Sequence, residues 1–204
     1  MGIPLLTTKL HIPPRRPSSV SRPRLMARLD EALRLQHRLV LVSAKAGTGK
    51  TTLVSEWVHG QERRAQWISL DGSDNDPSRF LSYLLAALQH LGIKIEPGRS
   101  ETPQLPPAED LVADLINRVA ASAIPFLLVL DDYHVIGDEW VHQAIGFLVE
   151  HQPPGMQLIL ISRVDPPLPL ARLRGRGQVT EIRDRDLRFT AEEATRFLQV
   201  MGLA

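Results

Sequence analysis

The sequence contains no cysteine, and this absence excludes disulfides, thiolate catalysis and Cys-ligated zinc. Aromatic residues are scarce, at 5% of the 204 residues. None lies between Arg163 and Arg188, where seven arginines are interleaved with four acidic residues. Because no ring there can stack a base, this stretch is predicted to be a solvated, partly paired surface and not a nucleic-acid-binding stripe.

A large net charge and long apolar runs are also missing. Lys and Arg number 24 against 23 Asp and Glu, so the net charge of +1 creates no field that would attract nucleic acid. No apolar stretch approaches the roughly 20 residues that span a bilayer. The segment 1–10, which is followed by several prolines, is a poor secretion signal. The composition therefore predicts a cytoplasmic chain of about one domain, with no membrane partner.

What the sequence does contain is a glycine-bearing turn between an apolar run and a predicted helix. Residues 39–53 read Leu-Val-Leu-Val-Ser-Ala-Lys-Ala-Gly-Thr-Gly-Lys-Thr-Thr-Leu. In a phosphate-binding loop, glycines such as Gly47 and Gly49 let backbone N–H groups surround phosphate oxygens. Lys50 then brings a cation to the β- and γ-phosphates, and Thr51 offers a hydroxyl to Mg²⁺. The spacing predicts such a loop at this position.

The loop departs from the usual pattern G-x-x-x-x-G-K-[ST] at its first position, where this chain has Ala44. The alternative interpretation is a chance Gly-Thr-Gly-Lys turn between a strand and a helix. Because strand, turn and helix occur in the order that phosphate binding requires, the sequence favours the phosphate-binding loop.

Hydrophobic periodicity predicts five strands that alternate with helices. Strands are expected over residues 39–43, 66–70, 126–130, 157–162 and 178–182, and helices over 23–36, 49–59, 77–91, 108–121, 138–150 and from a capping box at 190–193. Right-handed crossovers then give a parallel sheet with helices on both faces. The predicted fold is an α/β P-loop NTPase, a three-layer α/β/α sandwich with a five-stranded parallel sheet, which binds ligands at the carboxyl ends of its strands.

Two other segments are expected to be irregular. Residues 1–20 contain four prolines and are predicted to form an extended arm that needs a partner surface. Residues 97–107 are also rich in proline and are predicted to form a surface loop.

A pair of aspartates follows the apolar run 126–130. A nucleoside triphosphatase needs a carboxylate near Mg²⁺, and we expect it from the end of a strand next to the phosphate-binding loop. Asp131 is expected to hold Mg²⁺ through water, and Asp132 to orient the attacking water or accept its proton. The alternative is a pair of aspartates that ends a buried strand in a turn.

Ser162 and Arg163 end the strand that follows the acidic pair. A guanidinium at this edge of the sheet would distinguish ATP from ADP through charge-assisted hydrogen bonds to the third phosphate. The alternative is an arginine that bonds to the loop after it. Arg22, together with Val20, is expected to border the adenine.

Several segments occur together in an order that resembles one family. They are Thr8-Lys-Leu-His-Ile-Pro-Pro14, Val20-Ser-Arg-Pro-Arg-Leu25, Ala46-Gly-Thr-Gly-Lys-Thr-Thr52, Trp67-Ile-Ser-Leu-Asp71 with Asn75-Asp-Pro77, Leu128-Val-Leu-Asp-Asp-Tyr-His134 and Ser162-Arg163. Over nearly its whole length the chain resembles the N-terminal part of MalT-like regulators, which are large ATPases of the STAND class that usually end in a LuxR-type helix-turn-helix. The Lys-Leu-x-x-Pro and Asp-Asp-Tyr-His segments are more specific than the phosphate-binding loop.

The resemblance implies a nucleotide switch. ADP would hold the full protein inactive, while ATP and an inducer together would promote self-association and activation of transcription. It implies an arm of residues 1–22 that borders the nucleotide site, followed by a P-loop NTPase core of residues 23–204. The lid, winged-helix, sensor and DNA-binding domains would lie in the parent protein, so that the inducer and DNA are partners of the parent only.

From these patterns we expect slow ATP hydrolysis that involves Lys50, Asp131, Asp132 and Arg163, with Mg²⁺ at Thr51 and Asp131. The residues expected to bind ATP or ADP are Val20, Arg22, Ala46, Gly47, Thr48, Gly49, Lys50, Thr51, Thr52 and Ser162. The alternative function is that of an autonomous small P-loop kinase, supported by size and topology alone. A third is a binding scaffold with a degenerate site, to which Ala44 lends some support.

Overall fold

The central feature of the computed structural model, which describes residues 4–15, 19–94 and 106–202, is a single parallel sheet. Its five strands lie in the order β2-β3-β4-β1-β5, and each neighbouring pair is parallel. The strands are β1 (Leu39–Ser43), β2 (Arg64–Ser69), β3 (Phe126–Asp131), β4 (Met156–Ser162) and β5 (Val179–Arg183). The predicted five-stranded parallel sheet is therefore confirmed.

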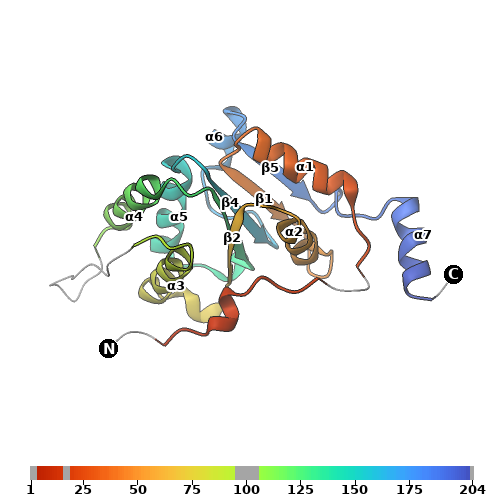
Figure 1. Ribbon diagram of the computed structural model, residues 1–204, viewed down its shortest axis with the longest axis horizontal. Coiled ribbons are helices and arrows are strands. Elements are labelled where there is room, and N and C mark those ends of the chain that lie inside the picture. The colour runs from red at the N-terminus through yellow and green to blue at the C-terminus, as the bar shows by residue number, and fades with distance from the viewer. Residues whose placement is uncertain (1–3, 16–18, 95–105, 203–204) are drawn as a thin grey trace.

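Helices cover both faces of the sheet, as Figure 1 shows. They are α1 (Pro23–Arg34), α2 (Lys50–His59), α3 (Pro77–His90), α4 (Ala108–Ser122), α5 (Glu139–Glu150), α6 (Leu170–Gly175) and α7 (Ala191–Val200). Short 3₁₀ helices are η1 (Thr7–Leu10), η2 (Gly72–Asn75) and η3 (Tyr133–Val135). In the ranges that the structure describes, no helix is long and apolar enough to cross a bilayer. The three-layer α/β/α sandwich is confirmed.

Two hydrophobic cores lie on opposite faces of the sheet. Leu39 and Leu41 of β1 belong to the core formed with α3, α4 and α5, whereas Val40 and Val42 belong to the core formed with α1 and α2. Alternation along the strand explains this division, since successive side chains point to opposite faces. Every residue of β1, β3 and β4 is buried, which is why these strands appear in the sequence as continuous apolar runs.

Helix starts follow the capping residues that the sequence predicts. The Asp76 carboxylate accepts a hydrogen bond from the N–H of Arg79 (2.8 Å), with Pro77 in the first position of α3. At the start of α7, Thr190 and Glu193 form the predicted reciprocal capping box. These local interactions fix where both helices begin.

Strand order differs from one sequence expectation. The strand that ends in Asp131 is not next to the phosphate-binding strand, because β4 lies between β1 and β3. Periodicity identifies strands, but it does not specify on which side of β1 each crossover returns. The sequence also gave no sign of α6, a six-residue helix that follows a proline-rich stretch. Of the predicted loop 97–107, residues 97–105 lie outside the described residues.

The N-terminal arm packs on the domain itself. The surface that the arm needs is therefore part of this chain. The arm contains the short helix η1, so it is not extended throughout. Leu10 is buried in the core on the α3 side of the sheet. Further along, Ser55 of α2 donates a hydrogen bond to the carbonyl of Pro13. The arm is thus attached both near α3 and at the helix that follows the glycine-rich loop.

An ionic cluster anchors the arm beside β2. Lys9 Nζ lies 2.6 Å from Asp74 Oδ2 and 2.8 Å from Asp71 Oδ2, and it sits 4.9 Å from the centroid of the Tyr83 ring. The Asp74 side chain is fully buried, and the Tyr83 hydroxyl accepts a hydrogen bond from the N–H of Leu6 (3.0 Å). We call these residues the Lys9 cluster.

Candidate functional site

The loop between β1 and α2 has the backbone that its glycines predict. Gly47 and Gly49 adopt left-handed φ angles of 79° and 85°, a region in which residues with a Cβ are strained. Gly49 precedes α2 as its N-cap, and a Cβ there would lie 3.3 Å from Arg22 Nη2. The left-handed backbone therefore favours glycine at position 49, and a Cβ there would also press on the Arg22 guanidinium.

Ala44, at the first position of the loop, is accommodated without strain. Among the described residues, positive φ angles occur at glycines and at Gln36, Ala123 and Asp132 only, so Ala44 has none. Its side chain is buried, and its N–H donates a hydrogen bond to the carbonyl of Ser162 (3.2 Å). The backbone at this position therefore does not need glycine.

Lys50 folds back over the loop. Its Nζ donates to the carbonyl of Lys45 (2.9 Å), and Thr48 Oγ1 donates to the same oxygen (3.0 Å). An ammonium has three donors, so two remain for a ligand. Burial lowers the pKa of Lys50, and the charge of Arg163 acts in the same direction, against the opposing effect of the Asp132 carboxylate. An anion would relieve this penalty on the charged form.

Asp131 comes together with Thr51, as the sequence predicts for a metal site. Thr51 Oγ1 donates to Asp131 Oδ1 (3.2 Å), which also accepts the N–H of Asp132 (2.9 Å). Burial, reinforced by the neighbouring charge of Asp132, raises the pKa of Asp131 to about 6. A buried carboxylate next to a hydroxyl, both hard oxygen donors, fits Mg²⁺, whose charge would stabilise the ionised form.

No larger metal cluster accompanies this pair. Within the described part of the chain, no group of three or more His, Cys, Asp or Glu side chains is arranged to hold a metal ion. Sites for Mg²⁺ commonly use one or two protein carboxylates, with waters and substrate phosphates as the other ligands. The Thr51 and Asp131 pair, with one carboxylate and one hydroxyl, fits a site of this kind.

Asp132 and Arg163 are the more accessible members of the expected set. Asp132 has a left-handed backbone (φ 57°), and its Oδ1 lies 3.7 Å from Nδ1 of His134. Arg163 is exposed. Its charge acts in the same direction as burial, which is the main cause that lowers the pKa of Lys50 and of His134. Among the described residues Arg163 makes no hydrogen bond or ion pair, so it does not bond to the loop after it.

Ser162 is directed into its own loop. Its hydroxyl donates to the carbonyl of Val164 (2.6 Å) and accepts the N–H of the same residue (3.3 Å). The side chain is buried. The structure therefore gives Ser162 a role in shaping the loop around Arg163, and shows no free hydroxyl that points to a ligand.

An open pocket of about 440 Å³ adjoins the glycine-rich loop, a size that suits a small ligand. Of the expected binding residues, the ones that line it are Val20, Arg22, Gly47, Thr48, Gly49 and Thr52. Sequence reasoning missed the wall contributed by the segment before α7 and by α7 itself, which includes Asp184, Leu187, Phe189 and Phe197. Ala46, Lys50 and Thr51 do not line this pocket, and neither do the residues at the ends of β3 and β4.

Arg22 joins the two walls of the pocket. Its Nη1 donates to the carbonyl of Leu187 (2.8 Å), and its guanidinium lies 4.5 Å from the centroid of the Phe189 ring. Phe189 in turn contacts Phe197 of α7, with ring centroids 5.5 Å apart. A flat guanidinium and an aromatic surface beside a glycine-rich loop can receive a planar heterocycle. No sequence signal joins Arg22 to Phe189, because they meet only through tertiary packing.

Comparison with known proteins connects the chain to ATPases and to transcriptional regulators. The family model described as an AAA ATPase domain matches residues 20–161. The HTH-type transcriptional regulator MalT of Serratia proteamaculans (strain 568) is 43% identical over 197 residues, and that of Cronobacter sakazakii (strain ATCC BAA-894) is 40% identical over 196. Each alignment covers 95% of this chain and 21% of the relative. The chain therefore spans about a fifth of the length of these relatives.

Solved structures share the fold at low sequence identity. The crystal structure of Cdc6p from Pyrobaculum aerophilum aligns with a TM-score of 0.59 and 17% identity, over 93% of this chain and 50% of that one. A Walker-type ATPase of Pyrococcus abyssi aligns with a TM-score of 0.55 and 16% identity, over 91% of this chain and 58% of that one. These similarities support a P-loop NTPase fold.

Proposed function

The chain belongs to the AAA ATPase domain family, and on that premise we propose that it is the adenine-nucleotide switch domain of a larger, MalT-like transcriptional activator. The observation that carries this proposal is the contact between Thr51 and Asp131, which lie 80 residues apart in the sequence. It brings the hydroxyl after Lys50 to a buried carboxylate at the end of β3. Membership in the family implies nucleotide binding, and this pair supports a triphosphate with Mg²⁺ at the loop.

The nucleotide would lie across the carboxyl edge of the sheet. Backbone N–H groups of residues 46–52 would hold the phosphates, and Lys50 would contact the β- and γ-oxygens. The base would enter the pocket beside Val20 and Arg22, against the Phe189 ring. A divalent cation held at Thr51 and Asp131 would neutralise charge on the phosphates.

Hydrolysis would use the residues that remain accessible next to Lys50. Asp132, which is half exposed, would orient the attacking water or accept its proton. Arg163, with a guanidinium that makes no other bond among the described residues, would contact the third phosphate and so distinguish ATP from ADP. Because such a domain reports its nucleotide state through conformation, we propose that hydrolysis is slow.

The similarity to MalT regulators also supports proposals about the longer protein. There, the domain would act in the cytoplasm with C-terminal regulatory domains, an inducer and DNA, and ATP would promote self-association. The kinase alternative is not favoured, because the relatives are transcriptional regulators. Acceptor-dependent turnover at about 1 to 100 s⁻¹, a rate typical of kinases, would overturn the switch proposal.

Thermal unfolding of nucleotide-stripped protein tests the proposed function directly. Ligand at a hundred times its dissociation constant adds about 2.7 kcal/mol of stability, and each kcal/mol raises the midpoint of a domain of this size by roughly 2 to 4 °C. We expect Mg·ATP and Mg·ADP each to raise the midpoint by about 5 to 10 °C, and Mg·GTP to have a smaller effect. No shift with any nucleotide would contradict the proposal. Binding without hydrolysis, even in the longer protein, would support the scaffold alternative.

The substitution Asp131→Asn should weaken the dependence of ATP binding on Mg²⁺. The neutral amide keeps an oxygen near Thr51 but loses the negative charge that attracts the cation. We expect the factor by which Mg²⁺ increases ATP affinity to be about ten times smaller in this variant than in the wild type. Isothermal titration in Mg²⁺ and in EDTA would measure this factor. The control is Asp114→Asn, which removes an exposed ion pair with Arg118 on α4. An equal Mg²⁺ effect in both variants would exclude Asp131 from the metal site.

A further inference from the structure

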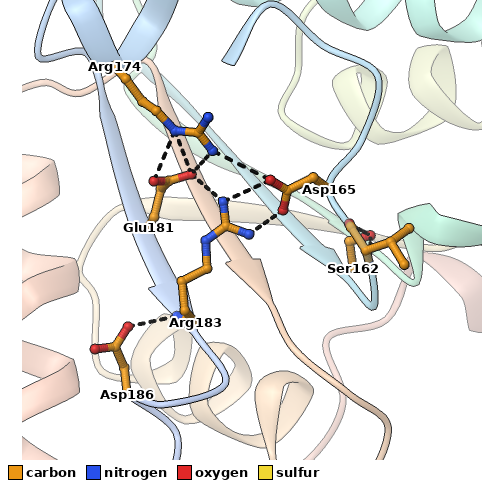
Figure 2. A network of polar contacts seen from close by, with 7 residues as sticks. Ser162, Asp165, Arg174, Glu181, Arg183 and Asp186 are labelled. Atoms are coloured by element: carbon orange, nitrogen blue, oxygen red, sulfur yellow. Dashed lines mark hydrogen bonds and ion pairs between the residues drawn. The ribbon is translucent and has the colours of Figure 1, made fainter. Parts of the chain in front are cut away.

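A network of four charged side chains joins the carboxyl ends of two strands next to the glycine-rich loop (Figure 2). Asp165 lies just after β4, Glu181 and Arg183 lie in β5, and Arg174 lies in α6. The two guanidinium groups alternate with the two carboxylates, and dashed lines in Figure 2 mark the contacts between them. The proposed nucleotide chemistry assigns no role to these residues.

The inner pair of this network is Asp165 and Arg183. Both terminal nitrogens of the Arg183 guanidinium contact the carboxylate, Nη1 with Oδ1 and Nη2 with Oδ2, the latter at 3.1 Å. This two-point geometry fixes orientation as well as distance. The hydrogen bond from Arg183 is also the main cause that lowers the pKa of Asp165. The outer partner Arg174 reaches Asp165 only at 3.4 Å and is more exposed than Arg183.

Through Arg183, Asp165 is also held next to the strand that leads into the glycine-rich loop. Its partner Arg183 lies directly opposite Ser43, the last residue of β1, in the register of the sheet. Ser43 ends β1, directly before Ala44, and it lies opposite Ser162 of β4 on one side and Arg183 of β5 on the other. The carboxylate therefore connects the loop after β4 to β5, on the far side of β1.

Arg163 lies in the middle of the segment that this network holds. On one side, the Ser162 hydroxyl bonds to Val164 and closes the turn. On the other side, Asp165 is fixed by Arg183. The backbone around Arg163 is thus held at both ends, while its own guanidinium makes no hydrogen bond or ion pair to any described residue. A held backbone with a free side chain suits a residue that must reach a ligand.

We propose that Arg183 is a positioning residue, which fixes the loop of Arg163 through Asp165 and thereby sets the preference for ATP over ADP. The inference rests on the proposed function, and specifically on a contact between Arg163 and the third phosphate. It goes beyond that function because it assigns nucleotide discrimination to a side chain that does not touch the nucleotide.

The test measures dissociation constants of Mg·ATP and Mg·ADP for variants of the 204-residue chain. Arg163→Ala should reduce the ratio of ADP to ATP dissociation constants about tenfold, since a charge-assisted bond to the third phosphate is lost. Arg183→Met should reduce the same ratio about threefold to fivefold and leave ADP affinity nearly unchanged. In the double variant the ratio should equal that of Arg163→Ala alone, because Arg183 acts through Arg163.

Two further variants separate positioning from general stability. Arg172→Met removes an ion pair between α6 and Glu150 (2.6 Å) that does not contact the Arg163 loop, so it should leave the ratio unchanged. Asp165→Asn weakens the inner pair from its other side and should reduce the ratio as Arg183→Met does. Both inner-pair variants should unfold within about 2 to 4 °C of the wild type, since partly exposed ion pairs contribute about 1 kcal/mol or less.

Each contrary result has a distinct meaning. If Arg163→Ala lowers the ratio but Arg183→Met and Asp165→Asn do not, the positioning role is wrong and the proposed function stands. If the effects of Arg163→Ala and Arg183→Met add in the double variant, Arg183 acts independently of Arg163 and the inference is also wrong. If Arg163→Ala leaves the ratio unchanged, the proposed sensor and the positioning role fail together.

Discussion

Replacing Lys50 with alanine should lower the affinity for Mg·ATP about a hundredfold and remove the thermal stabilisation by nucleotide. The Lys50 ammonium is bent over the loop by its hydrogen bond to the carbonyl of Lys45, so it is already in place for a phosphate. Its loss removes a charge-assisted contact to two phosphates at once. Alanine is a strong helix former and Lys50 is the first residue of α2, so the fold should remain intact.

The matched control for this substitution is Lys45→Ala, in the same loop. Lys45 is exposed, and only its backbone carbonyl takes part in the hydrogen bonds of the loop. We expect Lys45→Ala to change ATP affinity by less than about threefold, since a solvated charge contributes little. An equal loss in both variants would mean that the loop attracts nucleotide through general charge alone. Unchanged binding in Lys50→Ala would remove the phosphate-site assignment.

A second large effect is expected outside the glycine-rich loop, at the Lys9 cluster. Lys9→Met should lower the free energy of unfolding by about 2 to 3 kcal/mol, which corresponds to roughly 4 to 12 °C in Tm. The reason is the fully buried Asp74 carboxylate, which would lose its closest cation. Arg79 Nε, at 3.6 Å, is too far to form a hydrogen bond in its place. Calorimetric or denaturant unfolding would measure the loss.

A rescue experiment distinguishes this cause from loss of packing. Asp74→Asn in the Lys9→Met background replaces the uncompensated charge with a neutral amide, so it should restore more than half of the lost stability. The control is Lys94→Met, because Lys94 is exposed and should change stability by less than about 0.5 kcal/mol. Failure of the rescue, or an equal effect of the two lysine substitutions, would contradict the ionic anchoring of the arm.

The sequence predicted those parts of the fold that depend on neighbouring residues. The buried strands, the capping of α3 by Asp76 and the capping box at Thr190 are all encoded within a few positions. The same holds for the glycine-rich loop, where the spacing of Gly47 and Gly49 matches their left-handed backbone. These interactions are local, so periodicity and residue type are sufficient to predict them.

What the sequence could not predict depends on which distant segments meet. Packing decides that β4 lies between β1 and β3. The same packing decides that Asp131 approaches Thr51 across one intervening strand. The ring of Phe189 beside Arg22, and the pairing of Asp165 with Arg183, join residues with no common pattern in the sequence. The site residues on one loop were therefore predictable, whereas the walls and supports around them were not.

The hydrogen bond between Arg22 and Leu187 spans 165 residues, which has a consequence for how the protein is made. At a synthesis rate of about 5 to 20 residues per second, the two partners emerge roughly 10 to 30 s apart. For most of that interval β1, which is wholly buried in the finished domain, lacks β4 and β5 beside it. A nascent chain therefore carries its glycine-rich loop long before it has a pocket. On the proposed function, nucleotide would stabilise the domain only after the residues of this pocket wall have been made.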